Sequence, residues 1–418
     1  MSEPTDLPLR VRWIAVATLC VVACVPLSIA SAQVDCADLP HPIYGIGGSA
    51  PNVLLRYTAG ALRRISNPIT VVYQSPGACS AMGALVNDVP MTGTAKYWGA
   101  DDVEGSCNLP TGGVQASWGS MATTAPTCSG ITALPATVRD TVGPASAFSL
   151  IVPRNTTAQQ VISSEALYFL YGFGPAGHVA PWTNPATIAS RNITSAAGLL
   201  VAIAAGLPTT RQLFTNVTTG GWGFDVLTNQ AAVNYVAGVG NQAAIDDPNS
   251  AIGFTSTETA EAPANIPLVR SLAYQHVGQE QGYYPNSTPD SFDKQNVRDG
   301  HYYLWSVHHF YARQTSGGVI ENDDTARFIN YVTGVAEIPD GENFLDIVIS
   351  VGNIPDCAFS VTRQGDLGPL ASYQPPKSCN GYFEVSTTGE TEHDACDGPS
   401  DCTDSEFPAC NFGYCEVQ

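Results

Sequence analysis

The segment 51–87, PNVLLRYTAGALRRISNPITVVYQSPGACSAMGALVN, decides the fold class of this chain. Within it, residues 51–65 place leucine and isoleucine side chains at the spacing of one helix face. Residues 69–74, ITVVYQ, are rich in β-branched side chains and predict a buried strand. Residues 77–87 begin with a glycine turn that leads into a second helix. Because helix, strand and helix alternate, we expect an α/β domain in which helices cover a sheet.

The rest of the chain continues this alternation. Short runs rich in apolar and β-branched residues predict further strands at 147–155, 249–256 and 266–275. Apolar residues at helical spacing predict helices at 157–174, 194–208, 301–314 and 324–335. On the helix 301–314, the spacing of three histidines favours core or surface positions over a shared metal ion: His301, His308 and His309.

The size and charge of the chain limit its organisation and its partners. A chain of 418 residues suits two domains, since single cores stop growing at roughly 250–300 residues. The net charge is -20, and the only lysines are Lys96, Lys294 and Lys377. Binding to a nucleic-acid backbone needs clustered Lys and Arg, so we expect no nucleic-acid partner. One buried anion remains compatible with this charge, because a single arginine and backbone N–H groups suffice to hold it.

The first 32 residues have the pattern of a secretory signal peptide. Arg10 and Arg12 precede the apolar run WIAVATLCVVACVPLSIA, and the sequence ASA up to Ala32 offers a cleavage site of small residues. We expect cleavage after Ala32 and export to the periplasm, the cell surface or the extracellular space. A retained membrane anchor and a lipoprotein with a lipidated Cys24 are the alternatives.

The cysteine content agrees with export. Without Cys20 and Cys24 an even number remains, which in an exported chain predicts disulfides among Cys36, Cys79, Cys107, Cys128, Cys357, Cys379, Cys396, Cys402, Cys410 and Cys415. The simplest pairing joins neighbours, Cys107 with Cys128 and Cys357 with Cys379, although the sequence alone leaves the connectivity open.

The C-terminal segment 378–418 differs in composition from the rest. It contains no Lys or Arg, and its stretch CDGPSDCTDSEFPACNFGYC is dense in cysteine. Because so short a segment cannot bury a core of its own, we expect disulfides to hold it as a small appended unit. A metal site is the alternative, but the spacing matches neither a zinc pattern nor a calcium loop.

Three polar loops stand at predicted helix starts: GGSAPN (47–52), GACSAMG (77–83) and RNITSAAG (191–198). Each places a small hydroxyl side chain where the first backbone N–H groups of a helix have no partner within the helix. Such helix N-termini carry partial positive charge and suit an anion. An ordinary N-cap explains each loop alone, whereas three loops, one of them with Arg191, favour an anion site.

These loops resemble those of the phosphate-type class II periplasmic substrate-binding proteins of ABC transporters. The resemblance runs from about Pro42 to Tyr311 and is carried by GGSAPNVL, ITVVYQSPGACSAMGAL, PWTNPATIASRNITSAAG and RDGHYYLW. It implies two α/β lobes that close over a ligand and are joined by crossover strands near 147–153 and 262–270. The implied division is a signal peptide at 1–32, lobe I at 33–146 and 264–377, lobe II at 147–263 and the tail at 378–418.

The resemblance also implies which residues touch the ligand. From the first two loops, the contacts to an anion would come from Ser49, the backbone of Ala50, and Ser80. From the other lobe, they would come from Arg191, Ser195 and the N–H groups of Ala196 and Ala197.

Two positions depart from the family pattern. The Gly-Thr pair that follows the serine in the family is Ala196-Ala197 here, which removes a hydroxyl donor. The family also places a carboxylate in the first lobe, where it accepts a hydrogen bond from a protonated oxygen of phosphate, which sulfate lacks. In this chain Ser120, within VQASWGSM (114–121), stands at that position. We include Ser120 in the predicted anion site, and the selectivity for phosphate stays open.

These observations predict an exported, monomeric solute-binding protein that closes two lobes over a small, phosphate-like oxyanion and delivers it to an ABC transporter permease. We expect neither an enzyme nor a cofactor, because the sequence shows no metal cluster and no nucleophile motif paired with a base. The alternative is a structural or adhesive cell-surface protein that keeps the fold without a ligand, an idea motivated by the acidic, cysteine-rich tail.

Overall fold

The computed structural model describes residues 34–191, 195–207, 224–239 and 247–417. The predicted signal peptide lies outside these residues, as does Thr194 at the start of the predicted helix 194–208. Across the described ranges, no helix combines the length and the apolar character needed to cross a membrane.

Within the described residues, ten strands form the largest sheet. They are β1 (Val34–Asp35), β2 (Pro42–Gly47), β3 (Thr70–Gln74), β4 (Thr94–Trp98), β5 (Glu104–Asn108), β6 (Trp118–Met121), β7 (Val138–Pro153), β11 (Gly253–Ser256), β12 (Val269–Ser271) and β14 (Trp305–Arg313). Their order is β1-β5-β4-β3-β2-β6-β14-β7-β11, with β12 attached to β7. Since β2 pairs in parallel with both β3 and β6, the loops that follow these three strands lie at one edge of the sheet.

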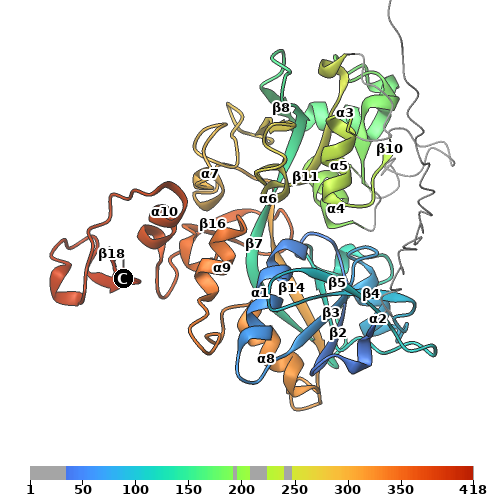
Figure 1. Cartoon of the computed structure of the whole chain (residues 1–418). Helices are drawn as coiled ribbons and strands as arrows, with labels where there is room; N and C mark the ends of the chain where they lie inside the picture. Colours follow the sequence, from blue (N-terminus) through green and yellow to red (C-terminus); the bar gives the residue numbers. More distant parts are fainter. Residues whose placement is uncertain (1–33, 192–194, 208–223, 240–246, 418) are drawn as a thin grey trace, which may run out of the picture. The chain divides into compact units, whose positions relative to one another are not determined.

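The longest strand, β7, links two groups of strands. Up to Ala147 it pairs with β14, and from Phe148 to Pro153 it pairs with β11 and β12. Figure 1 shows this strand in teal, passing from the strands around β14 to those around β11. The predicted two-lobed α/β fold is therefore confirmed, whereas the exact lobe boundaries stay predictions.

The helices follow the same division. The first group of strands packs with α1 (Asn52–Arg64), α2 (Ser80–Val86), α8 (Asp323–Val332) and α9 (Phe344–Ser350). The second group packs with α3 (Ser164–Phe173), α4 (Ala196–Ala204), α5 (Asn229–Val236) and α6 (Thr257–Ala260). The short helix α7 spans Gln295–Arg298. Small two-stranded sheets join β8 (Val161–Ser163) to β13 (Ala273–Gln275), β9 (Ala189–Ser190) to β10 (Phe224–Asp225), and β15 (Val361–Arg363) to β16 (Leu370–Ser372).

A cluster of aromatic side chains around Trp118 fixes the position of β2. Trp118 is fully buried, stacks on Tyr73 with ring centroids 5.3 Å apart, and contacts Phe328 at 4.6 Å. A Cβ atom at Gly45 would lie 2.1 Å from the Trp118 ring, so only glycine lets β2 approach β6 at this point. The close approach holds the end of β2, and the loop that follows it, against β6.

The predicted helix at 301–314 is wrong, because residues 305–313 form strand β14. Most of its side chains are buried on both faces, and such a central strand reads as a continuous apolar run. The pairing of β14 with β7 shifts register between Val307 and His309, and the two adjacent histidines have different surroundings. His308 is fully buried, which lowers its pKa to about 3 and keeps it neutral, while His309 lies 2.9 Å from Asp140.

Two further elements differ from prediction in their bounds. Within the predicted helix 157–174, residues 161–163 form β8 and the helix α3 begins only at Ser164. The predicted strand 266–275 is divided into β12 and β13, which pair with different partners. The predicted helices at 51–65 and 324–335 are confirmed as α1 and α8.

The predicted cysteines form five disulfides: Cys36–Cys107, Cys79–Cys128, Cys357–Cys379, Cys396–Cys410 and Cys402–Cys415. The neighbour pairing is confirmed for Cys357 with Cys379 and is wrong for Cys107 with Cys128. Because β1 pairs in parallel with β5 and places Val34 opposite Cys107, the sheet brings Cys36 to Cys107. Cys128 is then bonded to Cys79, which precedes α2.

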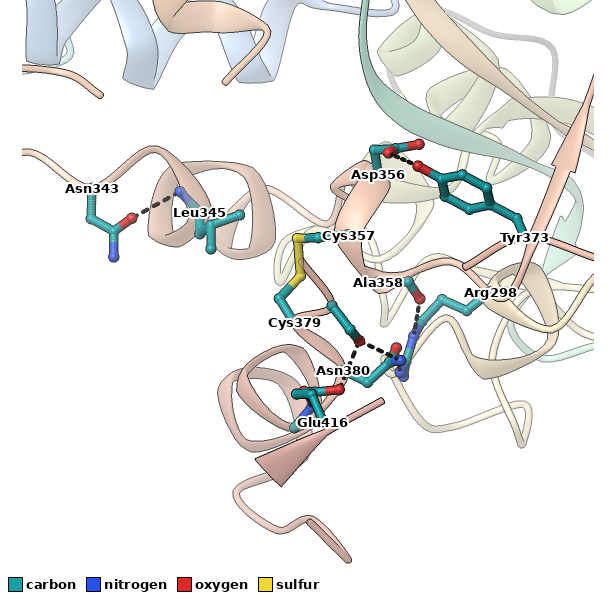
Figure 2. The surroundings of a disulfide bond; sticks show 12 residues. Arg298, Asn343, Leu345, Asp356, Cys357, Ala358, Tyr373, Cys379, Asn380 and Glu416 are labelled. Atoms are coloured by element: carbon teal, nitrogen blue, oxygen red, sulfur yellow. Dashed lines mark hydrogen bonds between the residues drawn. A yellow bond between two sulfur atoms is a disulfide. The ribbon is translucent and has the colours of Figure 1, made fainter. Parts of the chain in front are cut away.

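The C-terminal tail is a small unit held by disulfides, as predicted. It contains α10 (Asn380–Thr388) and the hairpin of β17 (Ala409–Asn411) and β18 (Tyr414–Glu416). Figure 2 shows its attachment, where Arg298 donates to the Ala358 carbonyl at 3.0 Å and to Asn380 Oδ1 at 2.8 Å, beside the disulfide of Cys357. The sulfur atoms of Cys396, Cys402 and Cys415 lie within 4.8 Å of one another, but each belongs to a disulfide.

Glu258 in α6 is a buried carboxyl that predicts a pH dependence of stability. Its Oε2 accepts a hydrogen bond from Ser146 Oγ at 3.0 Å, while Oε1 has no partner among the described residues. Burial raises its pKa from 4.5 to about 7. Between these two pH values the folded state keeps a proton that the unfolded state has released, so the free energy of unfolding falls as the pH rises, by at most about 3 kcal/mol for this group.

We expect the Glu258→Gln variant to lose this part of the pH dependence, since glutamine keeps an acceptor for Ser146 and does not ionise. The measurement is urea unfolding of both proteins at several pH values from about 4.5 to about 8. The variant should gain stability relative to the natural chain as the pH rises. Parallel stability curves would show that Glu258 titrates normally in the folded state.

Candidate functional site

A small cavity lies where the first and third predicted loops meet the segment that precedes α2. Its volume is about 20 Å³. Its lining consists of Gly48, Ser49, Ala50, Ser75, Pro76, Gly77, Ala78, Arg191, Ser195, Ala196, Ala197, Leu227 and Asn229. A volume of this size suits one compact ion and lies far below the roughly 300–1,000 Å³ typical of pockets for organic ligands.

The first loop, which follows β2, is held by backbone hydrogen bonds. Gly48 donates its N–H to the Ser120 carbonyl at 3.0 Å, and its own carbonyl accepts from the Tyr73 hydroxyl at 2.7 Å. The Asn52 N–H then bonds to the Ser49 carbonyl at 3.2 Å as α1 begins. Ser49 and Ala50 therefore reach the cavity from a loop anchored to two strands.

The second predicted loop (77–83) borders the cavity only through Gly77 and Ala78, which continue a stretch of the lining that begins at Ser75. Ser80 is not part of the lining, because it lies one turn further on and its hydroxyl donates to the Gly77 carbonyl at 2.5 Å. Gly77 donates its N–H to the Gly47 carbonyl at 3.2 Å, which ties the second loop to the first. The Cys79–Cys128 disulfide holds the end of this loop.

Arg191 brings a buried positive charge to the cavity from the end of β9. Only 3% of its surface is exposed. Nη1 donates to Asn229 Oδ1 at 2.6 Å, and Nη2 lies 3.2 Å from the Leu227 carbonyl and 3.4 Å from Ser49 Oγ. Asn229 is itself oriented by a hydrogen bond from its Nδ2 to Ser256 Oγ at 2.8 Å. The guanidinium group is thereby held in one direction, facing the first loop.

The cavity is also lined by residues at the starts of four helices. Ala50 precedes α1, Ala78 precedes α2, and Asn229 is the first residue of α5. At α4 the N-cap is Ser195, whose Oγ accepts from the Gly198 N–H at 3.0 Å, while Ala196 forms the first turn. The backbone N–H groups of a first turn lack acceptors within the helix and carry partial positive charge, so these ends reinforce the charge of Arg191.

The described residues of the cavity lining include hydroxyl, amide and backbone groups but no carboxylate. Ser120 stands where the family pattern has its acidic residue. It lies on β6, is fully buried and does not line the cavity. Its Oγ has no hydrogen-bond partner among the described residues. Its backbone carbonyl, rather than its side chain, supports the site by binding Gly48.

Six of the predicted residues thus border one cavity: Ser49, Ala50, Arg191, Ser195, Ala196 and Ala197. Ser80 and Ser120 lie elsewhere, and the sequence reasoning missed Ser75, Leu227 and Asn229. The Thr-Asn pair at 228–229 is a readable helix start, since Thr228 Oγ1 accepts from the Ala231 N–H at 3.1 Å. Nothing in the local sequence shows that this helix start faces Arg191, because that depends on how β9 and α5 pack.

No family model matches the chain, and no curated protein matches it. Solved structures match across most of the chain at low identity. A putative phosphate ABC transporter substrate-binding protein from Clostridium perfringens, with bound phosphate, is 12% identical, covers 75% of this chain and 99% of its own, and has a TM-score of 0.49. An ABC-type phosphate transport receptor from Vibrio cholerae is 13% identical, with coverages of 75% and 99% and a TM-score of 0.45. The OxyR regulatory domain from Pseudomonas aeruginosa is 9% identical, with coverages of 71% and 96% and a TM-score of 0.37. At these identities and TM-scores the matches carry no inference about the ligand or the role of this chain.

Proposed function

We propose that this chain is an exported solute-binding protein that holds one small tetrahedral oxyanion, phosphate or a close analogue, in the cavity beside Arg191. The observation that carries the proposal is the buried guanidinium group of Arg191, placed among the starts of four helices in a cavity of ionic size. A planar guanidinium group pairs with two oxygen atoms of an oxyanion, and hydroxyl groups and backbone N–H groups supply further short bonds.

The arrangement also supports a change of state on binding. Arg191 follows β9 and Ser195 caps α4, and both elements pack against β11 of the second group of strands. Ser49 and Ser75 follow β2 and β3, which belong to the first group. An anion that contacts both groups favours the arrangement in which they are closest, because only that arrangement offers all of its contacts. We propose delivery to an ABC transporter permease as the biological role, and export by the predicted signal peptide as the route.

A structural or adhesive surface role is the less favoured alternative. Such a role gives no reason for a buried arginine that faces hydroxyl groups and helix starts from another part of the chain.

Calorimetric titration of the chain from Gln33 onward with phosphate, sulfate and arsenate tests the proposal. We expect saturable binding of one ion per chain that is lost when Arg191 is replaced by methionine. Absence of heat with all three ions, at concentrations of up to about 1 mM, at which even binding of about -4 kcal/mol would be measurable, would contradict the anion proposal.

The lining also predicts how ion selectivity depends on pH. A site that prefers a protonated oxyanion needs a strong acceptor for that proton, and the described lining has no carboxylate to provide one. We therefore expect phosphate affinity to rise with pH through the second ionisation of phosphate, while sulfate affinity stays level. The check is a pair of titrations at about pH 6 and about pH 8. Phosphate binding that weakens as the pH rises would instead indicate an acceptor for the protonated ion.

A further inference from the structure

A second cavity lies away from the anion cavity and shares no lining residue with it. Its volume is about 280 Å³, close to the lower end of the range for small organic ligands. Its walls come from β7, β14 and the segment 356–366. Trp305, Phe359 and Val142 supply apolar surface, and Val142 stands at the rim with 54% of its surface exposed.

Arg363 brings a positive charge to this cavity. Its guanidinium carbon lies 3.7 Å from the centre of the Trp305 ring and 4.7 Å from that of Tyr303, and Nη1 donates to the Tyr303 carbonyl at 3.2 Å. Nε and Nη2 have no hydrogen-bond partner among the described residues. Both atoms are enclosed by protein, so a ligand in the cavity meets the positive charge of the guanidinium group rather than this edge. Burial lowers the pKa of Arg363 to about 10, so it remains charged at neutral pH.

Asp366 brings a negative charge to the same cavity and is held firmly. Its Oδ2 accepts from the N–H and the hydroxyl of Thr124 at 2.7 and 2.6 Å, and its Oδ1 accepts from Ser306 Oγ at 3.1 Å. Asp356 lies at the cavity as well and accepts from the Tyr373 hydroxyl at 2.5 Å (Figure 2). Among the described residues, neither carboxylate forms an ion pair within 4.0 Å of Arg363, and the charge of Asp366 acts on the guanidinium group from a greater distance.

Trp305 forms part of the apolar wall of this cavity and is only 3% exposed. The cavity therefore combines the positive charge of Arg363 with two carboxylates, which attract a positively charged group.

We propose that this cavity binds a small zwitterion of amino-acid size, whose carboxylate pairs with Arg363 and whose ammonium group lies toward Asp366 and Asp356. A simple anion is opposed by the two carboxylates, and a simple cation is opposed by the guanidinium group. A ligand that carries both charges pairs with the guanidinium group and with the carboxylates. An apolar side chain on it would pack against Phe359 and Val142. This cavity shares no lining residue with the anion cavity, so a failed test of one proposal leaves the other unaffected.

The test is calorimetric titration of the chain from Gln33 onward at neutral pH with L-leucine, 4-methylpentanoate and 3-methylbutylamine. These probes share one apolar body and carry both charges, only the negative charge, or only the positive charge. We expect L-leucine to bind and each singly charged probe to bind at least about tenfold more weakly, since each leaves one buried charge of the cavity unanswered. Absence of leucine binding, or equal affinity for 4-methylpentanoate, would overturn the proposal.

Single-residue variants test whether leucine binds in this cavity. Arg363→Met keeps the apolar contact with Trp305 and removes the charge, and Asp366→Asn keeps acceptor and shape and removes the opposite charge. Each should weaken leucine binding at least about tenfold, while the matched control Arg154→Met, an exposed arginine outside both cavities, should not. Val142→Trp should block the rim with both charges intact, which keeps the test available if a charge variant fails to fold. Leucine affinity that is unchanged in Val142→Trp and in the folded charge variants would exclude this cavity.

Discussion

Replacing Arg191 by methionine is expected to lower the affinity for phosphate by at least about 100-fold. Removal of one partner of a buried, hydrogen-bonded charge pair costs roughly 2–5 kcal/mol, and about 2.7 kcal/mol corresponds to that factor. Methionine retains most of the apolar stem and removes the charge together with the paired donors. The exposure of Arg191, only 3%, means that little water is present to replace the lost contacts. The measurement is calorimetric titration with phosphate.

The control for this prediction is Arg154→Met, which changes the net charge equally at an exposed ion pair with Asp290. It should leave phosphate affinity within about threefold, because surface ion pairs contribute about 0–1 kcal/mol even to stability. A folded Arg191→Met protein that binds phosphate as tightly as this control would place the binding elsewhere. Because Arg191 also donates to Asn229 and to the Leu227 carbonyl, the folded state of each variant must be verified by circular dichroism.

Removal of the Cys79–Cys128 disulfide is expected to lower both the stability of the fold and its affinity for phosphate. These cysteines are separated by 49 residues, and closing a loop of that length lowers the entropy of the unfolded chain by an amount worth about 4 kcal/mol. The bond also holds the loop that lines the anion cavity from Ser75 to Ala78. The double variant Cys79→Ser with Cys128→Ser should therefore unfold at lower denaturant and bind phosphate more weakly. Guanidinium unfolding and phosphate titration measure the two effects.

A disulfide of the tail provides the matched control. Cys402–Cys415 closes a separation of only 13 residues inside the C-terminal unit, away from the anion cavity. Its replacement by two serines should leave phosphate affinity unchanged, since no lining residue of that cavity belongs to the tail. If both double variants weaken phosphate binding equally, the effect is one of general destabilisation and not of loop positioning.

The alternation of helix and strand at 51–87 was sufficient to predict the α/β class, because α1 and α2 each present one apolar face and β3 is continuously buried. The same reasoning failed at 301–314. β14 is a central strand that pairs with β6 and β7, and most of its side chains are buried whichever face they project from. A strand buried on both faces has no alternation to distinguish it from an apolar helix, so the local pattern fails there.

In the anion cavity, too, local patterns identified some residues and only the tertiary structure identified the others. The loops GGSAPN and RNITSAAG, with Arg191, were readable as helix starts with unpaired N–H groups. Ser75 and Asn229 were not, because Ser75 reaches the cavity only through the register of β2 against β3, and Asn229 only through its hydrogen bond to Arg191. Ser120 was predicted to line the cavity and does not, since its position in β6 directs its side chain into the interior.

What the sequence determined by itself was local: helix starts, strands with one buried face, a cysteine-dense tail and the presence of one arginine at a polar loop. These follow from side-chain periodicity and backbone hydrogen bonding within a few residues. The tertiary structure alone decided which cysteines pair, that 305–313 is a strand, and that four helix starts and Arg191 border one cavity. Each of these depends on contacts between residues far apart in the chain, and sheet order and register set those distances.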